Sequence, residues 1–251
     1  MSWLSPRACQ THLVRDRSPV MEAEMLAGVA ARRSAIYWTL ADVFLTCPNE
    51  AIVARLSNDL VRLSGPETAD ALTMSLLAET LPDAGDAAGV IGLAVEYTRL
   101  FGGLSASYGL PPPYEAVHRK VESAADVAVA VTQCYSDAGL AAVDASVPPD
   151  HLGVELKFVS LLCHSESEAW RKNLGAESVQ ALGRQRAFLD DHLLRWAPDY
   201  LKLVQTQARD AFFRKFSQIA LTAVTEDREL IEDVLVQLNS TGPTGIAAPI
   251  V

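Results

Sequence analysis

The residues of this chain whose types and spacing could perform chemistry are histidines and carboxylates beside two groups of prolines. His151 and Glu155 lie four positions apart in VPPDHLGVELKF (147–158), and His118 lies in PPPYEAVHR (111–119). Positions four apart share one face of a helix, so His151 and Glu155 have the spacing of half a metal site. The sequence offers no second His-x-x-x-His or matching carboxylate pair to complete it. A metal-dependent hydrolase that uses His118, His151 and Glu155 is therefore the least favoured of three functional hypotheses.

The same two stretches also have the composition of helix starts. Pro113 suits the first turn of a helix, where no backbone amide donor is needed. Asp150 follows Pro148 and Pro149, and we expect its carboxylate to cap the next helix, because it can accept free backbone amides at the positive end of the helix dipole. On that helix we expect one face to carry His151, Glu155, Phe158 and Leu162, and a separate core face to carry Leu152, Leu156, Val159 and Cys163.

Sequence motifs of the common enzyme classes are missing. There is no GxGxxG, no phosphate-binding loop, no HExxH and no GxSxG. His192, in FLDDHLLRW, has the surroundings of a histidine that packs between helices near acids. Cys9, Cys47, Cys134 and Cys163 form no CxxC pair, and we expect the last three to be buried free thiols, which fits a reducing, cytoplasmic compartment. We predict a protein that is not an enzyme and has no metal and no resident cofactor.

Composition and charge narrow the partners. The chain has 251 residues, 49% of them hydrophobic, with a net charge of −10, and no apolar run approaches the roughly 20 residues of a membrane span. Residues 63–98 and 121–156 each contain six acids and no Lys or Arg. A surface of that sign repels phosphate backbones and attracts cations, so we expect no nucleic acid and no stable membrane insertion. The acidic stretches are either a surface for a basic peptide partner or ordinary solvated faces of helices.

Hydrophobic periodicity predicts an all-α fold. Apolar residues recur at helical spacing through most of the chain, as in the stripe Ile36, Leu40, Val43, Phe44 and Cys47. Period-two alternation and hairpin turns are nearly missing. Glycine and proline breaks then leave about eight or nine helices in a single globular domain. We expect a flexible N-terminal extension over 1–25, the helical domain over 26–238 and a disordered tail over 239–251.

The pair Arg32-Arg33 is superficially similar to a twin-arginine export signal. Asp42 interrupts the apolar segment that follows, however, and no small-residue cleavage site comes after it. We therefore assign both arginines to a helix surface.

Three blocks of the sequence are similar, in order and spacing, to the TorD/DmsD family of cytoplasmic chaperones for molybdenum redox enzymes. The blocks are EYTRLFGG (96–103), PPPYEAVHR (111–119) and VPPDHLGVELKFVSLLC (147–163). RRSAIYWTLADVFLTCP and FLDDHLLRWAP also resemble the first helix and a late helix of that family, so the similarity covers roughly residues 30–225. The resemblance implies a TorD-like helical domain without catalytic activity.

The chain departs from the family pattern at three positions. Ala116 replaces the usual serine, His118 stands where an aromatic residue is common, and Val147 occupies an acid position. The departures put in doubt any role that depends on the missing acid or hydroxyl. They suggest a branch with its own client, and we assign it to the branch that serves type II dimethyl sulfoxide reductase-like enzymes.

The resemblance implies a chaperone that binds the twin-arginine signal peptide and the apo form of a molybdoenzyme catalytic subunit. Such a chaperone supports cofactor insertion and prevents premature export. Guanine nucleotide or molybdopterin guanine dinucleotide would be a further, weakly bound partner. The residues that the resemblance places at the peptide site are Tyr97, Leu100, Phe101, Pro113, Tyr114, Glu115, His118, Pro148, Asp150, His151 and Glu155.

We expect two kinds of contact at that site. Leu100, Phe101 and Tyr114 would line an apolar groove, while Glu115, Asp150 and Glu155 would supply negative charge for the arginines of the peptide. His151 would face the partner and weaken the acidic field when protonated near pH 6.5. The remaining hypothesis is a helical binding module with some other protein partner. Sequence alone does not identify the client, the true start codon or whether the chain forms a domain-swapped dimer.

Overall fold

A computed structural model describes residues 19–65, 71–103, 109–119, 123–140 and 147–240 of the chain. Its elements in order are α1 (Pro19–Leu45), α2 (Glu50–Leu63), α3 (Ala71–Ala78), α4 (Ala87–Phe101), α5 (Glu115–His118), α6 (Ala124–Asp137), α7 (Leu152–Arg171), α8 (Gly175–Asp191), the 3-10 helix η3 (Leu193–Arg195), α9 (Ala197–Gln207) and α10 (Ala211–Ser240). The all-α prediction is confirmed. The expected eight or nine helices agree with the nine α-helices of eight or more residues among the described residues, and only the single turn of α5 is shorter.

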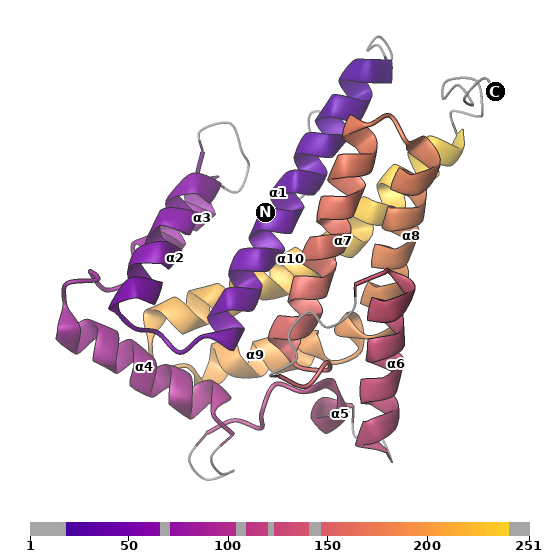
Figure 1. The fold of residues 1–251 in the computed structure, drawn as a ribbon. Coiled ribbons are helices and arrows are strands. Elements are labelled where there is room, and N and C mark those ends of the chain that lie inside the picture. The colour runs from indigo at the N-terminus through magenta and orange to yellow at the C-terminus, as the bar shows by residue number, and fades with distance from the viewer. Residues whose placement is uncertain (1–18, 66–70, 104–108, 120–122, 141–146, 241–251) are drawn as a thin grey trace.

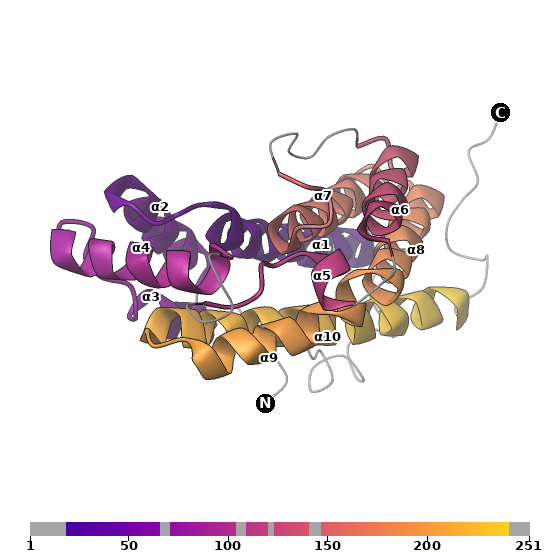
Figure 2. The ribbon, with the colours of Figure 1, turned by 90° about the horizontal axis from the view of Figure 1, so that it is seen from below.

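The helices form two groups, one on either side of α1, and α10 extends along both (Figures 1 and 2). Figure 1 shows α2, α3 and α4 on one side of α1, and α7, α8 and α6 on the other. Seen from below, in Figure 2, α10 extends along both groups, and the shorter α9 lies beside it. The long helix α10 therefore connects the two groups of helices, and it packs closely on α9 and α8.

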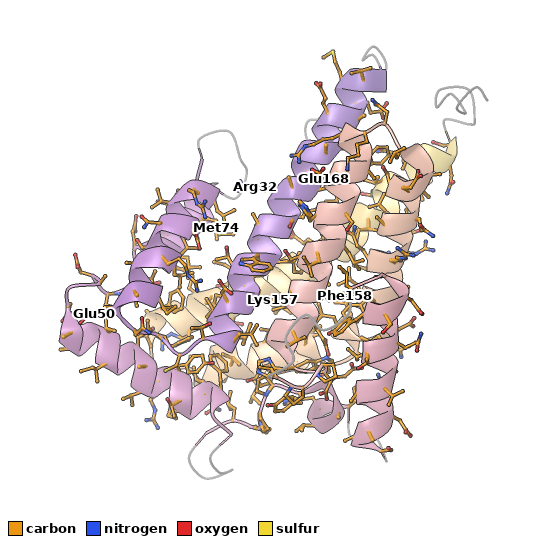
Figure 3. The ribbon with its side chains drawn as sticks, in the orientation of Figure 1. Arg32, Glu50, Met74, Lys157, Phe158 and Glu168 are labelled. Carbon is orange, nitrogen blue, oxygen red and sulfur yellow. The ribbon has the colours of Figure 1, made fainter. Side chains whose placement is uncertain are left out.

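The most extensive helix pair is α1 with α7. Gly153 permits their close approach, because a Cβ atom there would meet the side chain of Leu45 at 2.5 Å and the carbonyl oxygen of Ala41 at 3.1 Å. Phe158 points from α7 towards α6 and α8 (Figure 3), where its ring lies 4.5 Å from Tyr135 and 4.7 Å from Phe188. The expected division of α7 into a core face and a partner face was wrong. Both faces are buried because neighbouring helices cover them.

Arg33 lies inside the molecule and not on the surface, so that prediction was wrong. Its guanidinium donates to Glu166 Oε2 at 2.8 Å, to Asp227 Oδ2 at 2.9 Å and to the side chain of Gln185. Tyr37 donates its hydroxyl hydrogen to the same Asp227 oxygen at 2.9 Å. This buried arginine network joins α1, α7, α8 and α10, and its charges are paired as burial requires.

Arg32 has a different environment from its neighbour. It points from α1 towards the end of α2 (Figure 3), where Nη2 donates to the carbonyl oxygen of Leu63 at 2.7 Å. Cys47 also departs from its prediction, because it lies beyond the end of α1 and is exposed, whereas Cys163 is buried and Cys134 is half-buried.

The expected ends of the domain differ slightly from the ends of the helices. α1 begins at Pro19, inside the segment 1–25, and α10 ends at Ser240. Residues 1–18 and 241–251 lie outside the described residues, so the structure does not describe most of either predicted tail. Among the described helices, none combines the length and the apolar character of a membrane span.

Candidate functional site

Two of the three sequence blocks meet through their backbones. Tyr114 forms an isolated antiparallel bridge with His151. The amide of Glu115 donates to the carbonyl oxygen of Asp150 at 2.9 Å, and the amide of Leu152 donates to that of Pro113 at 2.9 Å. We call residues 111–119 and 147–155 the proline corner. It carries α5 between α9 and α6 (Figures 1 and 2).

The helix caps at the corner differ from the sequence prediction. The N-cap of α7 is His151, whose Nδ1 accepts the amide of Gly153 at 3.0 Å. Asp150 instead accepts the amide of Ala116 at 3.3 Å, so its carboxylate caps α5 on the neighbouring segment. Asp150 was therefore assigned to the wrong helix, because the backbone pairing that carries it to α5 has no local sequence signal.

His151 is buried and neutral. Burial lowers the pKa of its imidazole to about 4, and Nδ1 must be unprotonated to accept the hydrogen bond from Gly153. The expected protonation near pH 6.5 is therefore wrong. Its ring packs edge-on against Tyr114 at 5.2 Å and faces the interior.

Glu115 is buried and already paired within the chain. Its two carboxylate oxygens lie 3.2 and 3.0 Å from Nδ1 of His192, and Oε1 also accepts from Nη1 of Arg119. Although burial opposes ionisation, hydrogen bonds and the positive charges of His192 and Arg119 lower the pKa of Glu115. The corner thus contains an internal ion-pair cluster. Its cation Arg119 was not recognised from sequence, and His192 was expected near acids but not beside Glu115.

Glu155 is completely buried in the first turn of α7. Trp196 donates its indole N–H to Oε2 at 3.2 Å, and Oε1 has no hydrogen-bond partner within the described part of the chain. Burial and the neighbouring charge of Glu115 raise the pKa of Glu155 well above its ordinary value. Its carboxyl group therefore favours the neutral form and lies inside the protein, contrary to the expected partner-facing acid.

The residues of the hydrolase hypothesis are engaged in other contacts. The ring of His118 lies 5.4 Å from Trp196 and 4.7 Å from Tyr200, and its Nε2 is 3.1 Å from the carbonyl oxygen of Pro112. Burial lowers the pKa of His118. In the described ranges no three His, Cys, Asp or Glu side chains form a group that could hold a metal ion.

The first sequence block lies mainly in the core. Leu100 is completely buried and Phe101 nearly so, and the ring of Phe101 contacts Phe44 at 5.2 Å and Phe213 at 5.5 Å. Tyr97 donates its hydroxyl hydrogen to the carbonyl oxygen of Phe44 at 2.9 Å. Leu100 and Phe101 therefore do not line an open groove in this structure, because the aromatic residues of α1 and α10 cover them.

The solvent-accessible rim of the corner is mainly apolar, with the side chain of Arg119 30% exposed beside it. Val117 is 45% exposed, Pro148 is exposed, and Tyr114 and His118 are half-buried. Pro113 is buried beneath them. Acidic charge therefore lies below this rim, and no ion pair among the described residues joins a cation to Asp150 or to the fully buried Glu155, whereas Glu115 is paired with Arg119 and His192.

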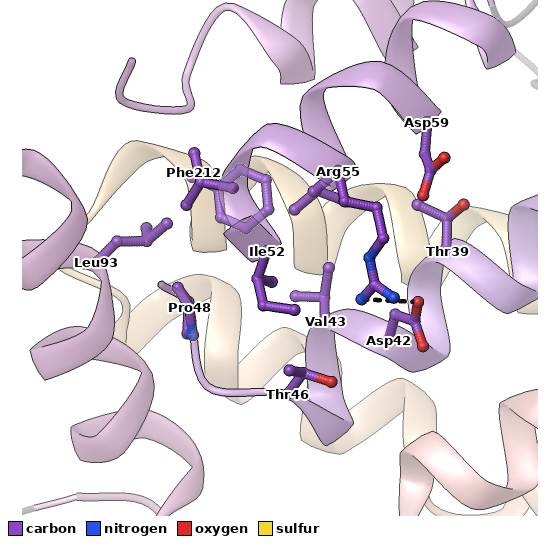
Figure 4. Close-up of a pocket in the computed structure, with 12 residues that line it drawn as sticks. Thr39, Asp42, Val43, Thr46, Pro48, Ile52, Arg55, Asp59, Leu93 and Phe212 are labelled. Carbon is purple, nitrogen blue, oxygen red and sulfur yellow. Dashed lines mark ion pairs between the residues drawn. The ribbon is translucent and has the colours of Figure 1, made fainter. Parts of the chain in front are cut away.

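A separate crevice lies between α1, α2 and α4 (Figure 4). Val43, Ile52 and Leu93 contribute apolar lining, and an ion pair of 3.2 Å joins Arg55 to Asp42 at its edge. Phe212 of α10 also lines it. The lining has the composition of a packing defect between helices, without a nucleophile or an acid–base pair.

Comparison with known proteins agrees with the sequence blocks. The family model described as nitrate reductase delta subunit matches residues 66–202, which is more than half of the chain and includes the proline corner. The chain is 25% identical to the chaperone protein TorD of Vibrio cholerae over 213 residues, covering 81% of this chain and 94% of that protein.

Two further similarities are more limited. A segment of 68 residues is 35% identical to the selenate reductase assembly chaperone protein of Thauera selenatis, so the match spans 27% of this chain and only 33% of that relative. A crystal structure of a redox enzyme maturation protein from Archaeoglobus fulgidus matches with a TM-score of 0.43 and 21% identity, covering 79% of this chain and 93% of that one. The resemblance to TorD-like chaperones is confirmed by the sequence matches, and the chain belongs to the nitrate reductase delta subunit family.

Proposed function

We propose that this protein is a system-specific chaperone for the catalytic subunit of a molybdenum enzyme. It binds the twin-arginine signal peptide and the apo form of that subunit in the cytoplasm, supports cofactor insertion and delays export. The observation that carries the proposal is the proline corner, because the family-matched segment brings two of its characteristic blocks into one backbone-paired unit. The role is that of a binding protein and not of a catalyst.

The structure changes which residues we propose for peptide contact. Val117, Tyr114, His118 and Pro148 form the accessible apolar rim that would receive the hydrophobic part of the peptide. Asp150 is the acid best placed to meet an arginine, because Glu115 is already paired with Arg119 and His192. Glu155, Leu100 and Phe101 then support the site from within.

Asp150 also has a physical reason to accept a cation. Burial and the charge of Glu115 raise the pKa of its carboxyl group, so its ionised form is under-compensated in the free protein. A guanidinium group would relieve that deficit through a charge-assisted hydrogen bond, which is strongest where water is partly excluded. Binding and charge neutralisation are therefore coupled at one residue.

Titration of a synthetic client signal peptide tests this assignment. Asp150→Asn keeps an oxygen that can cap α5 but removes the charge, and we expect peptide affinity to fall about tenfold. Asp199→Asn is the matched control, because Asp199 is a highly exposed acid on α9 and its loss gives the same change in net charge. Equal affinity of the Asp150 and Asp199 variants would remove Asp150 from the peptide site.

The identity of the client and of any small ligand needs separate experiments. Recovery of an apo molybdoenzyme subunit with the tagged chaperone would support the assigned partner, whereas recovery of a different protein would favour a general helical binding module. We propose that the client is a type II dimethyl sulfoxide reductase-like enzyme, since one relative is named for selenate reductase assembly. Equilibrium dialysis with a guanine nucleotide tests the weak nucleotide binding that the resemblance suggests.

A further inference from the structure

A cysteine, a histidine and a glutamate from three separate elements form a connected row beside the proline corner. Nε2 of His192 lies 3.6 Å from Sγ of Cys134, and Nδ1 of the same ring lies 3.0 Å from Oε2 of Glu115. Cys134 is in the last turn of α6, His192 follows α8 and Glu115 begins α5. The two ring nitrogens of one imidazole thus contact a thiol and a carboxylate.

A carboxylate, an imidazole and a thiol in contact in this order can activate the thiol as a nucleophile. The carboxylate of Glu115 orients the ring and favours its positive charge, while the other ring nitrogen can exchange a proton with sulfur. Although burial opposes that charge, hydrogen bonds with Cys134 and Glu115 raise the pKa of His192 to about 9. His192 is also the C-cap of α8, where the helix dipole stabilises a cation.

Other groups around the row leave the imidazolium as the main source of stabilisation for a thiolate. The end of α6 opposes negative charge on Cys134, because the helix dipole is negative there. Arg119 neutralises part of the charge of Glu115, and Phe188 stacks on the His192 ring at 5.1 Å. Glu155 and Asp150 each lie close enough to Glu115 to interact with its charge.

We propose that Cys134 is a reactive thiol, activated by the Glu115–His192 pair and oxidised by peroxides to a sulfenic acid. The thiolate sulfur attacks one peroxide oxygen, an S–O bond forms and the O–O bond breaks. The departing oxygen takes the proton of the His192 imidazolium and leaves as water or an alcohol. Sulfur is oxidised by two electrons and the peroxide is reduced by two.

The three described cysteines differ in solvent exposure, so the reactivity of Cys134 can be compared with that of thiols in the same protein. Cys134 is half-buried, so a small oxidant can reach it, whereas Cys163 is completely buried between helices. Cys47 is exposed and is the matched control for a thiol outside the row. The proposal is independent of peptide binding, so it stands or fails separately from the proposed chaperone function.

The first measurement is the alkylation rate of Cys134 by iodoacetamide at about pH 7, where an ordinary thiol is mostly protonated. The protein carries Cys9→Ser and Cys47→Ser, and a second protein with Cys9→Ser and Cys134→Ser reports Cys47. We expect His192→Gln and Glu115→Gln each to slow the alkylation of Cys134 by about tenfold or more and to leave the rate of Cys47 unchanged.

The variants and the oxidant complete the test. Treatment with peroxide followed by a 1,3-dione probe should label Cys134 and leave Cys47 unlabelled. An unchanged alkylation rate of Cys134 in His192→Gln would overturn the proposal. Failure to trap a sulfenic acid would overturn the peroxide step. Should either variant unfold, the labelling of Cys134 in the protein with His192 intact decides.

Discussion

Two buried clusters of charge, one at each end of α7, have opposite designs. The arginine network surrounds Arg33 with Glu166, Asp227 and Gln185, so a single cation is enclosed by two acids and a neutral acceptor deep in the helix packing. The proline corner instead places three acids beneath an accessible apolar rim, and one oxygen of Glu155 lacks a partner in the described residues. The first arrangement is typical of a structural network, whereas the second leaves capacity for a ligand.

Loss of Arg33 should give the largest effect on stability. Arg33→Met leaves Glu166 and Asp227 as uncompensated buried acids, so we expect the free energy of unfolding to fall by about 3 to 5 kcal/mol. Arg62→Met is the control, because its side chain is 79% exposed, and it should change stability by less than about 0.5 kcal/mol. Urea denaturation measures both. Similar values for the two variants would show that the network does not stabilise the fold.

The His192–Glu115 ion pair should make the stability of the corner depend on pH. The pKa of His192 is raised from about 6.5 to about 9, so its contribution is complete below pH 6.5 and is lost as pH rises through 9. We expect the protein to lose about 1 to 2 kcal/mol between pH 6.5 and 9.5, allowing for the partial solvent screening of the corner. His192→Gln should flatten that interval, and an equally steep loss in the variant would argue against the ion pair.

Replacing Glu155 with a neutral glutamine should change the free energy of unfolding little at low pH and should increase it, relative to the parent protein, as the pH rises. The folded-state pKa of Glu155 is raised, so its contribution is present below its ordinary pKa of about 4.5 and is lost as pH rises through the raised value. Glu155→Gln should cost less than about 1 kcal/mol at pH 5 and become relatively more stable towards pH 8. Chemical denaturation at the two pH values measures this trend. The opposite trend would mean that Glu155 is stabilised in its ionised form.

The same comparison shows what could be predicted from sequence. The apolar stripes through Ile36, Leu40, Val43 and Phe44 predicted α1 and its buried face correctly, because helical periodicity is a local signal. Arg33 was missed because Glu166 and Asp227 lie 133 and 194 positions away in the chain. A local pattern does not reveal partners at that separation.

The candidate site was predicted by residue type better than by exposure. Tyr114, Asp150 and His151 were expected at one site, and they lie together through backbone pairing that the sequence did not predict. The burial of His118 and Glu155 could not be predicted, since Trp196 of a later segment stacks on the ring of His118 and donates a hydrogen bond to Glu155. His192 was expected near acids, but its partner is Glu115 and not an acid beside it in sequence.

Site-specific crosslinking tests the central claim that the client signal peptide binds at the proline corner. A photoreactive p-benzoylphenylalanine is placed at Val117, which is 45% exposed on the rim, or at Val61, which is 61% exposed on α2. We predict that a twin-arginine signal peptide crosslinks at position 117 and that a peptide with both arginines replaced by alanine does so much less. Efficient crosslinking at position 61 with none at position 117 would contradict the account.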